Sequence, residues 1–256
     1  MKLLLKKVFR IRFINFLKKQ IDPRPFLEPV VANNNFSSYS DCFPWRTDNG
    51  FKTIFKFFDL IKLFYNLDNN NIKINIYSKN YNLLKKIDKE NIEDVNEFLI
   101  TKELVGLEDY GFFNIFHQPY NFDIKLNKVK LSDKSYVGFF KNTNIPSFVH
   151  GNIPIKMNFD DSTDNNLIFK SIFINKKYYI QSSFKETDFV ELFFTNPTSK
   201  NIELILENNK YFLKPHNSII LKIRDLNKII KIRSNCSFLR PYVFSYKKKS
   251  FDCFHS

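Results

Sequence analysis

The stretch Asn201-Ile202-Glu203-Leu204-Ile205-Leu206-Glu207-Asn208-Asn209-Lys210-Tyr211-Phe212-Leu213 carries the pattern that decides the fold class. Apolar and acidic side chains alternate along its first half: Ile202, Leu204 and Leu206 against Glu203 and Glu207. Successive side chains of a β-strand point to opposite faces, so this alternation is typical of a strand with one buried face. Asn208-Asn209 suits a tight turn, and an apolar run follows it. The stretch therefore predicts an antiparallel hairpin.

The same style recurs along most of the chain. Ile72, Ile74 and Ile76 alternate with polar residues, as do Ile219, Leu221 and Ile223. Other apolar segments predict further strands: 51–58, 60–65, 110–116, 135–140, 188–195, 229–232 and 242–246. Segment 89–105 is compatible with a short helix or a strand. Strands at intervals of about 8–12 residues with Asn-rich turns between them are typical of a sandwich or barrel.

We therefore expect a mostly β protein made of two packed antiparallel β-sandwich units, with a short basic helix at its N-terminus. Residues 1–35 are predicted to form a basic helical arm and a connector rich in Pro and Asn. The first sandwich unit is expected at 36–118, a linker at 119–134, and the second unit at 135–256. The last residues include two Phe and a Cys, which favours a C-terminal tail docked on the body.

The N-terminal segment and the overall charge bear on location. Residues 1–20 hold seven basic and no acidic residues, and their longest uninterrupted apolar run is three residues. That run is too short for a secretory signal or a membrane-spanning helix, although a basic arm can contact an anionic membrane surface. The formal net charge is +14, mostly from Lys. Much of this excess matches the residue bias of an AT-rich coding sequence.

Two further features of the composition exclude classes of function. The chain has only 5 Gly and lacks the glycine-rich phosphate-binding motifs of nucleotide-binding proteins. Its three Cys, at 42, 236 and 253, are an odd number without a CxxC pair. This argues against a disulfide framework and favours a reducing compartment, so we expect a cytoplasmic protein.

The segment Ser40–Phe51 is the first candidate site, because it contains the chain's only Trp together with an Arg and two Asp. Pro44 and Asp48-Asn49-Gly50 favour a shaped loop that leads into a strand at Phe51. Asp41, Trp45 and Arg46 are candidate ligand-binding residues, since Trp offers a stacking face and Arg a planar fork. The alternative is a hydrophobic plug in which the aromatic residues cap a core and Asp41 pairs with Arg46.

A second group of candidates lies far apart in the sequence. His150 and Asn152 flank Gly151 at the end of an apolar segment, His255 closes the docked tail, and Arg240 precedes Pro241. We consider these four residues candidates for ligand binding, and His150, Asp252 and His255 candidates for a divalent metal. His150 beside Asp252 would also suit general base catalysis. The alternative is that both histidines satisfy local backbone groups.

One segment resembles a known family at the level of its pattern. In residues 188–244 an apolar strand ends in Phe193-Phe194-Thr195-Asn196-Pro197 and is followed by an alternating strand at 202–206. Tyr211-Phe212-Leu213-Lys214-Pro215, the strand 218–223 and a strand ending near Arg240-Pro241 complete the pattern. This run is similar to the small β-sandwich of the sensory-rhodopsin-transducer type. The resemblance implies a sandwich that binds a small ligand or another protein rather than an enzyme.

These observations favour an intracellular binding or interaction protein, related to carbohydrate and to surface-glycan or cell-envelope assembly. Its expected partner is a glycan or other small polar ligand, or another protein. The sequence identifies no cofactor. The first alternative is an enzyme with a His-centred, metal-dependent site between the two halves. The second is a basic scaffold on a membrane surface or on nucleic acid, although no nucleic-acid-binding module is recognised and we do not expect that partner.

Overall fold

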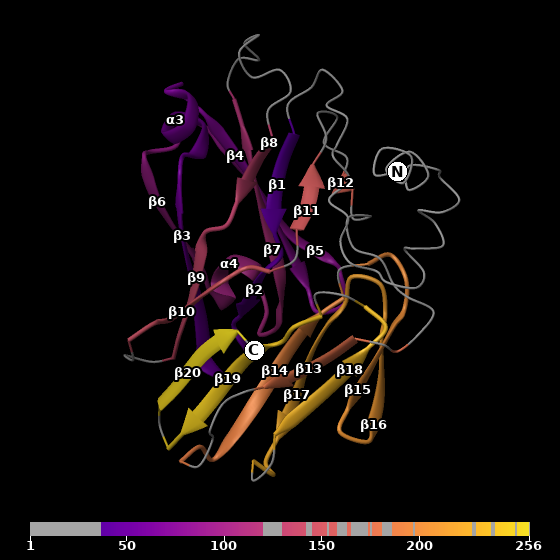
Figure 1. Ribbon diagram of the computed structural model, residues 1–256. Coiled ribbons are helices and arrows are strands. Elements are labelled where there is room, and N and C mark those ends of the chain that lie inside the picture. Colours follow the sequence, from indigo (N-terminus) through magenta and orange to yellow (C-terminus); the bar gives the residue numbers. More distant parts are fainter. Residues whose placement is uncertain are drawn as a thin grey trace, which may run out of the picture.

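The structure is a computed structural model that describes residues 37–119, 130–141, 145–152, 154–157, 163–164, 174, 176–180, 186–196, 198–226, 229–236, 239–248 and 250–255. Within these ranges the chain is mostly β, with two short helices, and its strands form four-stranded sheets (Figure 1). All strand pairs are antiparallel except β1 with β8. The predicted mostly β class with antiparallel sheets is confirmed.

Three sheets are built from the first two thirds of the chain. The β1 sheet has the order β12 (Thr163–Asp164), β11 (Pro154–Met157), β1 (Ser37–Asp41) and β8 (Lys130–Asp133). The β7 sheet has the order β2 (Phe43–Arg46), β7 (Tyr110–Gln118), β4 (Asn71–Ser78) and β5 (Leu83–Lys89). The β3 sheet has the order β10 (Ser147–His150), β9 (Tyr136–Lys141), β3 (Phe51–Phe58) and β6 (Val95–Ile100).

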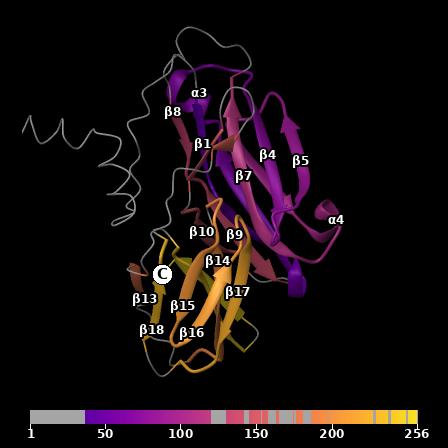
Figure 2. The same ribbon diagram turned by 90° about the vertical axis from the view of Figure 1, so that its right-hand side faces the viewer.

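Two sheets come from the remainder of the chain and lie at the other end of the molecule (Figures 1 and 2). The β15 sheet has the order β13 (Lys176–Ile180), β18 (Ile230–Ser234), β15 (Ile202–Leu206) and β16 (Asn209–Leu213). The β14 sheet has the order β17 (Ser218–Ile223), β14 (Phe189–Thr195), β19 (Tyr242–Lys247) and β20 (Ser250–His255). The C-terminal tail is therefore docked as a strand, as its apolar residues predicted.

The β14 sheet separates two hydrophobic cores. Leu192 and Phe194 of β14 belong to the core that includes the inner residues of the β15 sheet. Phe193, which points to the opposite face, packs in the core of the β3 and β7 sheets together with Tyr242 and Phe244. A strand that is buried on both faces needs apolar residues at consecutive positions, and this explains the unbroken Leu192-Phe193-Phe194.

Some local predictions are corrected by the structure. Segment 60–65 was expected as a strand, but it is helix α3 (Leu60–Tyr65), because the Asp59 carboxylate accepts from the backbone N–H groups of Ile61 and Lys62 and caps a helical turn. Segment 89–105 contains both alternatives, strand β6 and helix α4 (Lys102–Val105). In the β15–β16 hairpin the turn is Glu207-Asn208 rather than Asn208-Asn209, since Leu206 pairs with Asn209.

The sheets also divide the chain later than the sequence predicted. Strand β9 pairs with β3, and β11 pairs with β1, so residues up to 164 hydrogen-bond within the first three sheets. The expected linker 119–134 includes β8, a paired strand, and its residues 120–129 lie outside the described residues. The predicted basic arm 1–35 also lies outside them. Hydrogen bonding to β1 and β3, far away in sequence, is what places strands β8, β9 and β11 in these sheets.

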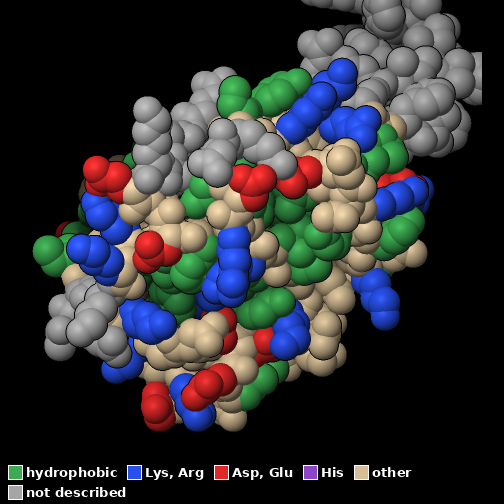
Figure 3. All heavy atoms as spheres, turned by 90° about the horizontal axis from the view of Figure 1, so that it is seen from below, with side chains coloured by type: hydrophobic (Ala, Val, Ile, Leu, Met, Phe, Trp, Pro, Cys, Tyr) green, Lys and Arg blue, Asp and Glu red, His purple; other side chains and the backbone are tan. Residues whose placement is uncertain are grey.

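The basic side chains do not gather into one patch on the face shown in Figure 3. There, Lys and Arg side chains are spread among hydrophobic and acidic ones. No helix in the described part of the chain has the length and hydrophobicity that a bilayer crossing requires.

Candidate functional site

Trp45 lies in the interior and offers no surface to a ligand. Strand β2 pairs with β7, so that Trp45 faces Gly111, and the indole is completely buried. Its Nε1 donates to the Tyr77 carbonyl oxygen at 2.8 Å. A Cβ on Gly111 would stand 2.1 Å from that same oxygen, so the close approach of β7 to β4 requires glycine here. The segment 43–46 is therefore a core strand, and the expectation of a ligand-contacting loop is corrected for Trp45.

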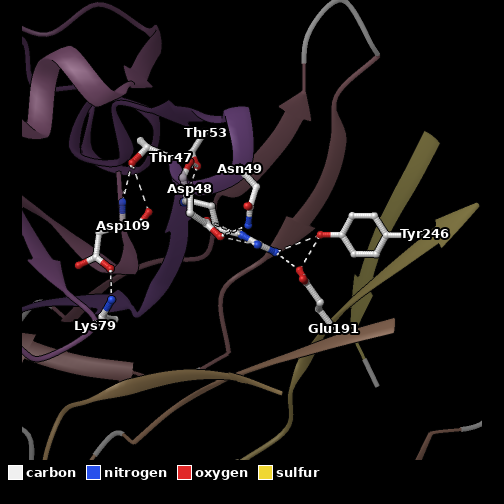
Figure 4. A network of polar contacts seen from close by, with 9 residues as sticks. Thr47, Asp48, Asn49, Thr53, Lys79, Asp109, Glu191 and Tyr246 are labelled. Carbon is white, nitrogen blue, oxygen red and sulfur yellow. Dashed lines mark hydrogen bonds and ion pairs between the residues drawn. The ribbon is translucent and has the colours of Figure 1, made fainter. Parts of the chain in front are cut away.

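Arg46 is buried as well, in a polar network that joins strand β2 to strands β14 and β19 (Figure 4). Its guanidinium forms ion pairs with Asp48 at 2.7 Å and with Glu191 of β14 at 2.6 Å. The rings of Phe51 and Phe244 lie 4.3 and 4.8 Å from its central carbon. The hydroxyl of Tyr246 donates to the same Glu191 oxygen at 2.6 Å.

The acidic groups of this network keep the buried Arg46 guanidinium charged. Burial acts to lower the pKa of Arg46, but the hydrogen bonds to Asp48 and the nearby acidic groups outweigh it and raise the pKa above its usual value. Burial of the Tyr246 hydroxyl, in contrast, raises its pKa. The hydrophobic-plug interpretation thus fits the 40–51 segment, with one correction: Arg46 pairs with Asp48 and Glu191, not with Asp41.

The other candidates meet where the edge strands β10 and β20 lie side by side. Ser147 Oγ donates to Asp252 Oδ1 at 2.5 Å and accepts from the Cys253 N–H at 2.8 Å. Three residues further along both strands, His150 meets His255. The constant offset shows that the two strands run in the same direction, joined through side chains where two different sheets meet.

The two imidazoles are in contact, with 4.3 Å between their ring centroids and an angle of 41° between their planes. Nδ1 of His150 bonds the Gly151 carbonyl at 2.6 Å, and Nε2 of His255 bonds the carbonyl of His150. A carbonyl oxygen only accepts, so His150 Nδ1 and His255 Nε2 carry protons, and His150 Nε2 and His255 Nδ1 have no hydrogen-bond partner in the described part of the chain. Burial, with the charges of His150 and Arg240, lowers the pKa of His255 to about 4.

Three more candidates surround this pair. Asn152 Nδ2 donates to the Arg240 carbonyl at 3.2 Å, and its Oδ1 has no hydrogen-bond partner among the described residues. The exposed Arg240 guanidinium lies 5.8 Å from the Tyr178 ring centroid. Asp41 lies beneath, so close to Gly151 that a Cβ there would stand 2.3 Å from its own Cβ. We call Asp41, His150, Asn152, Arg240 and His255 the seam site.

The Asp41 carboxylate is an unusual element of the seam site. It is 1% exposed, and neither oxygen accepts a hydrogen bond from a described residue; the Lys134 Nζ lies 3.6 Å from Oδ1. Burial raises its pKa, against the effect of Lys134. A buried carboxyl group without hydrogen bonds is either protonated or stabilised by a nearby cation such as Lys134. Such perturbed groups are frequent at functional sites.

The proposed metal ligands do not form a set. No group of three or more His, Cys, Asp or Glu side chains in the described ranges is placed to hold a metal ion. Asp252 and His255 are three positions apart on strand β20, so they point to opposite faces. The Asp252 carboxylate instead bonds Ser147. The same alternation corrects the expectation of Asp252 as a partner of a general base at His150.

The sequence interpretation missed residues whose position depends on sheet pairing. His117 is fully buried in β7 and bonds Asp133 Oδ2 through Nε2 at 2.7 Å. Tyr136 pairs with His150 across β9 and β10, and Phe148 pairs with Gly138 on the same face. Both aromatic side chains are exposed. No local pattern distinguishes them from other strand residues, so no motif would have found them.

Comparisons of the chain with protein-family models, with curated proteins and with solved structures find no match.

Proposed function

We propose that the protein is a binding module whose ligand is a glycan, held at the seam site and on the adjoining outer face of the β3 sheet. The observation that carries this proposal is the exposed pair Tyr136 and Phe148 beside His150, whose Nε2 is open. Binding sites commonly combine aromatic faces with a few fixed polar groups. Sugar rings have both apolar C–H faces and hydroxyl groups, and this surface offers a partner to each.

The aromatic residues are fixed on the sheet rather than carried on loops. The Phe148 ring fills the space above Gly138, where a Cβ would meet it at 2.7 Å. The Tyr136 and His150 rings are 6.4 Å apart, and Tyr136 is 57% exposed. A rigid surface loses little conformational entropy on binding. Polar groups at its border, His255 Nδ1 and the Arg240 guanidinium, supply an acceptor and donors for hydroxyl groups.

The wider expectations follow as parts of this proposal. The five sheets form two packed sandwich units that share the β14 sheet, and the second unit is of the sensory-rhodopsin-transducer type. The protein works in a reducing compartment inside the cell, in surface-glycan or cell-envelope assembly. All three Cys are buried as free thiols, which supports such a compartment.

An array of neutral and acidic oligosaccharides, followed by calorimetry with those retained, tests the proposal. We expect Tyr136→Ala and His150→Ala each to weaken binding about tenfold or more. Tyr179→Ala is the matched control, because Tyr179 is an exposed tyrosine on strand β13 that belongs neither to the seam site nor to the β3 sheet. If no oligosaccharide is retained, or if Tyr136→Ala binds as the wild type does, the proposed function is wrong.

A second candidate function is a hydrolase in which His150 acts as general base. It is favoured by the unpaired His150 Nε2 at an exposed position above the buried Asp41, because imidazole is the side chain that most often acts as a general base. Chromogenic glycosides and esters provide the assay. Turnover above the buffer rate that disappears in His150→Gln would support this function. Turnover that is absent, or that His150→Gln leaves unchanged, would exclude His150 from it.

A further inference from the structure

The outer face of the β15 sheet, a different sheet from the one that carries Tyr136 and Phe148, combines basic and aromatic side chains. We call it the basic face, defined by Lys177, Tyr179, Lys210, Phe212, Lys231 and Arg233. Strand pairing places these residues on one side: Lys177 opposite Arg233, and Tyr179 opposite Lys231. Ile205 faces both Arg233 and Lys210, and Glu203 faces Phe212. The inner residues of the same strands, such as Ile232 and Leu204, are buried in the core.

A row of cations crosses this sheet. Lys177, Arg233 and Lys210 lie in one line over four strands, with only Ile205 between the second and third. Neighbouring strands are about 4.8 Å apart, so the row spans about 14 Å. Lys210 pairs with Glu203 at 2.8 Å, whereas Lys177, Lys231 and Arg233 form no ion pair with another described residue. Three cations on this face therefore lack an acidic partner in the described ranges.

A hollow lies at the same place. It has a volume of about 330 Å³ and is lined by Lys231, Arg233, Ile229, Asn208 and Glu207. Its two cations exceed its single carboxylate, so the hollow favours an anion. This volume is at the small end of the range for ligand sites, the size of one nucleotide unit rather than of a folded partner.

The two aromatic residues stand at opposite corners of the face. Tyr179 on the edge strand β13 is 47% exposed, and Phe212 on the edge strand β16 is 64% exposed. Each ring has a lysine of the face beside it, Lys231 at 5.9 Å and Lys210 at 4.8 Å from the ring centroid. Aromatic rings beside cations on a surface match a ligand that alternates flat bases with phosphates.

From this arrangement we propose that the basic face binds single-stranded nucleic acid without sequence preference. Tyr179 and Phe212 stack on bases, and Lys177, Lys210, Lys231 and Arg233 neutralise phosphates. The four cations of this face match about four phosphates of one strand. A duplex hides its bases from the rings, and an acidic glycan lacks the flat base that a ring stacks on. The proposal is independent of the glycan site, because the two surfaces share no residue.

Fluorescence anisotropy with the full chain and labelled oligothymidine of about 12 nucleotides tests this proposal. Four neutralised phosphates predict a slope of log affinity against log salt of about −2.8. The double variant Lys231→Gln/Arg233→Gln should weaken binding about tenfold or more and reduce the slope to about −1.4. Tyr179→Ala and Phe212→Ala should each weaken it about fivefold or more without changing the slope.

Lys52→Gln/Lys85→Gln is the matched control, since it removes the same charge from exposed positions on β3 and β5. We expect it to bind as the wild type does. Loss equal to that of Lys231→Gln/Arg233→Gln would show that net charge alone attracts the strand, and would overturn the proposal. So would equal binding of heparin and oligothymidine combined with no effect of Tyr179→Ala and Phe212→Ala, because that result describes a polyanion surface without stacking.

Discussion

Removing the charge of Arg46 should destabilise the protein and not merely a ligand site. In Arg46→Met the apolar part of the side chain still packs between Phe51 and Phe244, but the carboxylates of Asp48 and Glu191 lose their partner. Breaking a buried ion pair from one side costs about 3–5 kcal/mol, because a charge remains that water does not reach. The side chains of Asp48 and Glu191 are 20% and 14% exposed, so solvent offsets part of this cost.

We therefore expect a loss of about 3 kcal/mol, the lower end of that range. For a chain of this length each kcal/mol lowers the midpoint of thermal unfolding by about 2–4 °C, which gives a decrease of about 10 °C. The matched control is Lys102→Met, which breaks an ion pair with Glu108 at 2.8 Å in which both side chains are more than half exposed. Such surface pairs contribute little to stability because water screens both charges.

Thermal and urea unfolding, followed by circular dichroism, provide the measurement. The double variant Arg46→Met/Glu191→Met should recover part of the lost stability, because Glu191 no longer remains as an unpaired charge. A midpoint of Arg46→Met that decreases no more than that of Lys102→Met would refute the reasoning. It would mean that the network contributes little to the stability of the fold, and Arg46 would again be a candidate for ligand binding.

Three further predictions concern the seam site. The His255 pKa of about 4 lies below its ordinary 6.5, so the unfolded chain binds a proton first and stability should decrease from pH 6.5 towards pH 4; urea midpoints of the wild type and His255→Gln measure this, and equal slopes would contradict it. Asp41 has a raised pKa and acts in the opposite direction, so Asp41→Asn should stabilise the protein at pH 7 by thermal unfolding, and a clear loss would show that the charge is needed. Gly151→Ala would bring a Cβ to 2.3 Å from that of Asp41 and should lower the free energy of unfolding by about 1–3 kcal/mol in urea. An unchanged midpoint would show that the backbone around Gly151 can move away from Asp41 at little cost.

The sequence determined the class of the fold because that class depends on local patterns. Alternation at Ile72, Ile74 and Ile76 and at Ile202, Leu204 and Leu206 is a property of neighbouring residues, and strands β4 and β15 formed where it predicted them. The same holds for the apolar tail that became β20. The exception, helix α3, also has a local cause in the Asp59 cap, which an apolar run conceals.

Only the tertiary structure decided which candidates meet. His150 and His255 are brought together because β10 and β20 are edge strands of different sheets that lie side by side, and no local pattern specifies which edges meet. Pairing of β2 with β7 buried Trp45. Strand β14 provides Glu191, 145 residues further along the chain, as the partner of Arg46. A residue's type and spacing thus indicated what chemistry it can perform. Whether it faces a core, a partner or solvent was decided by strand pairing over long distances in the sequence.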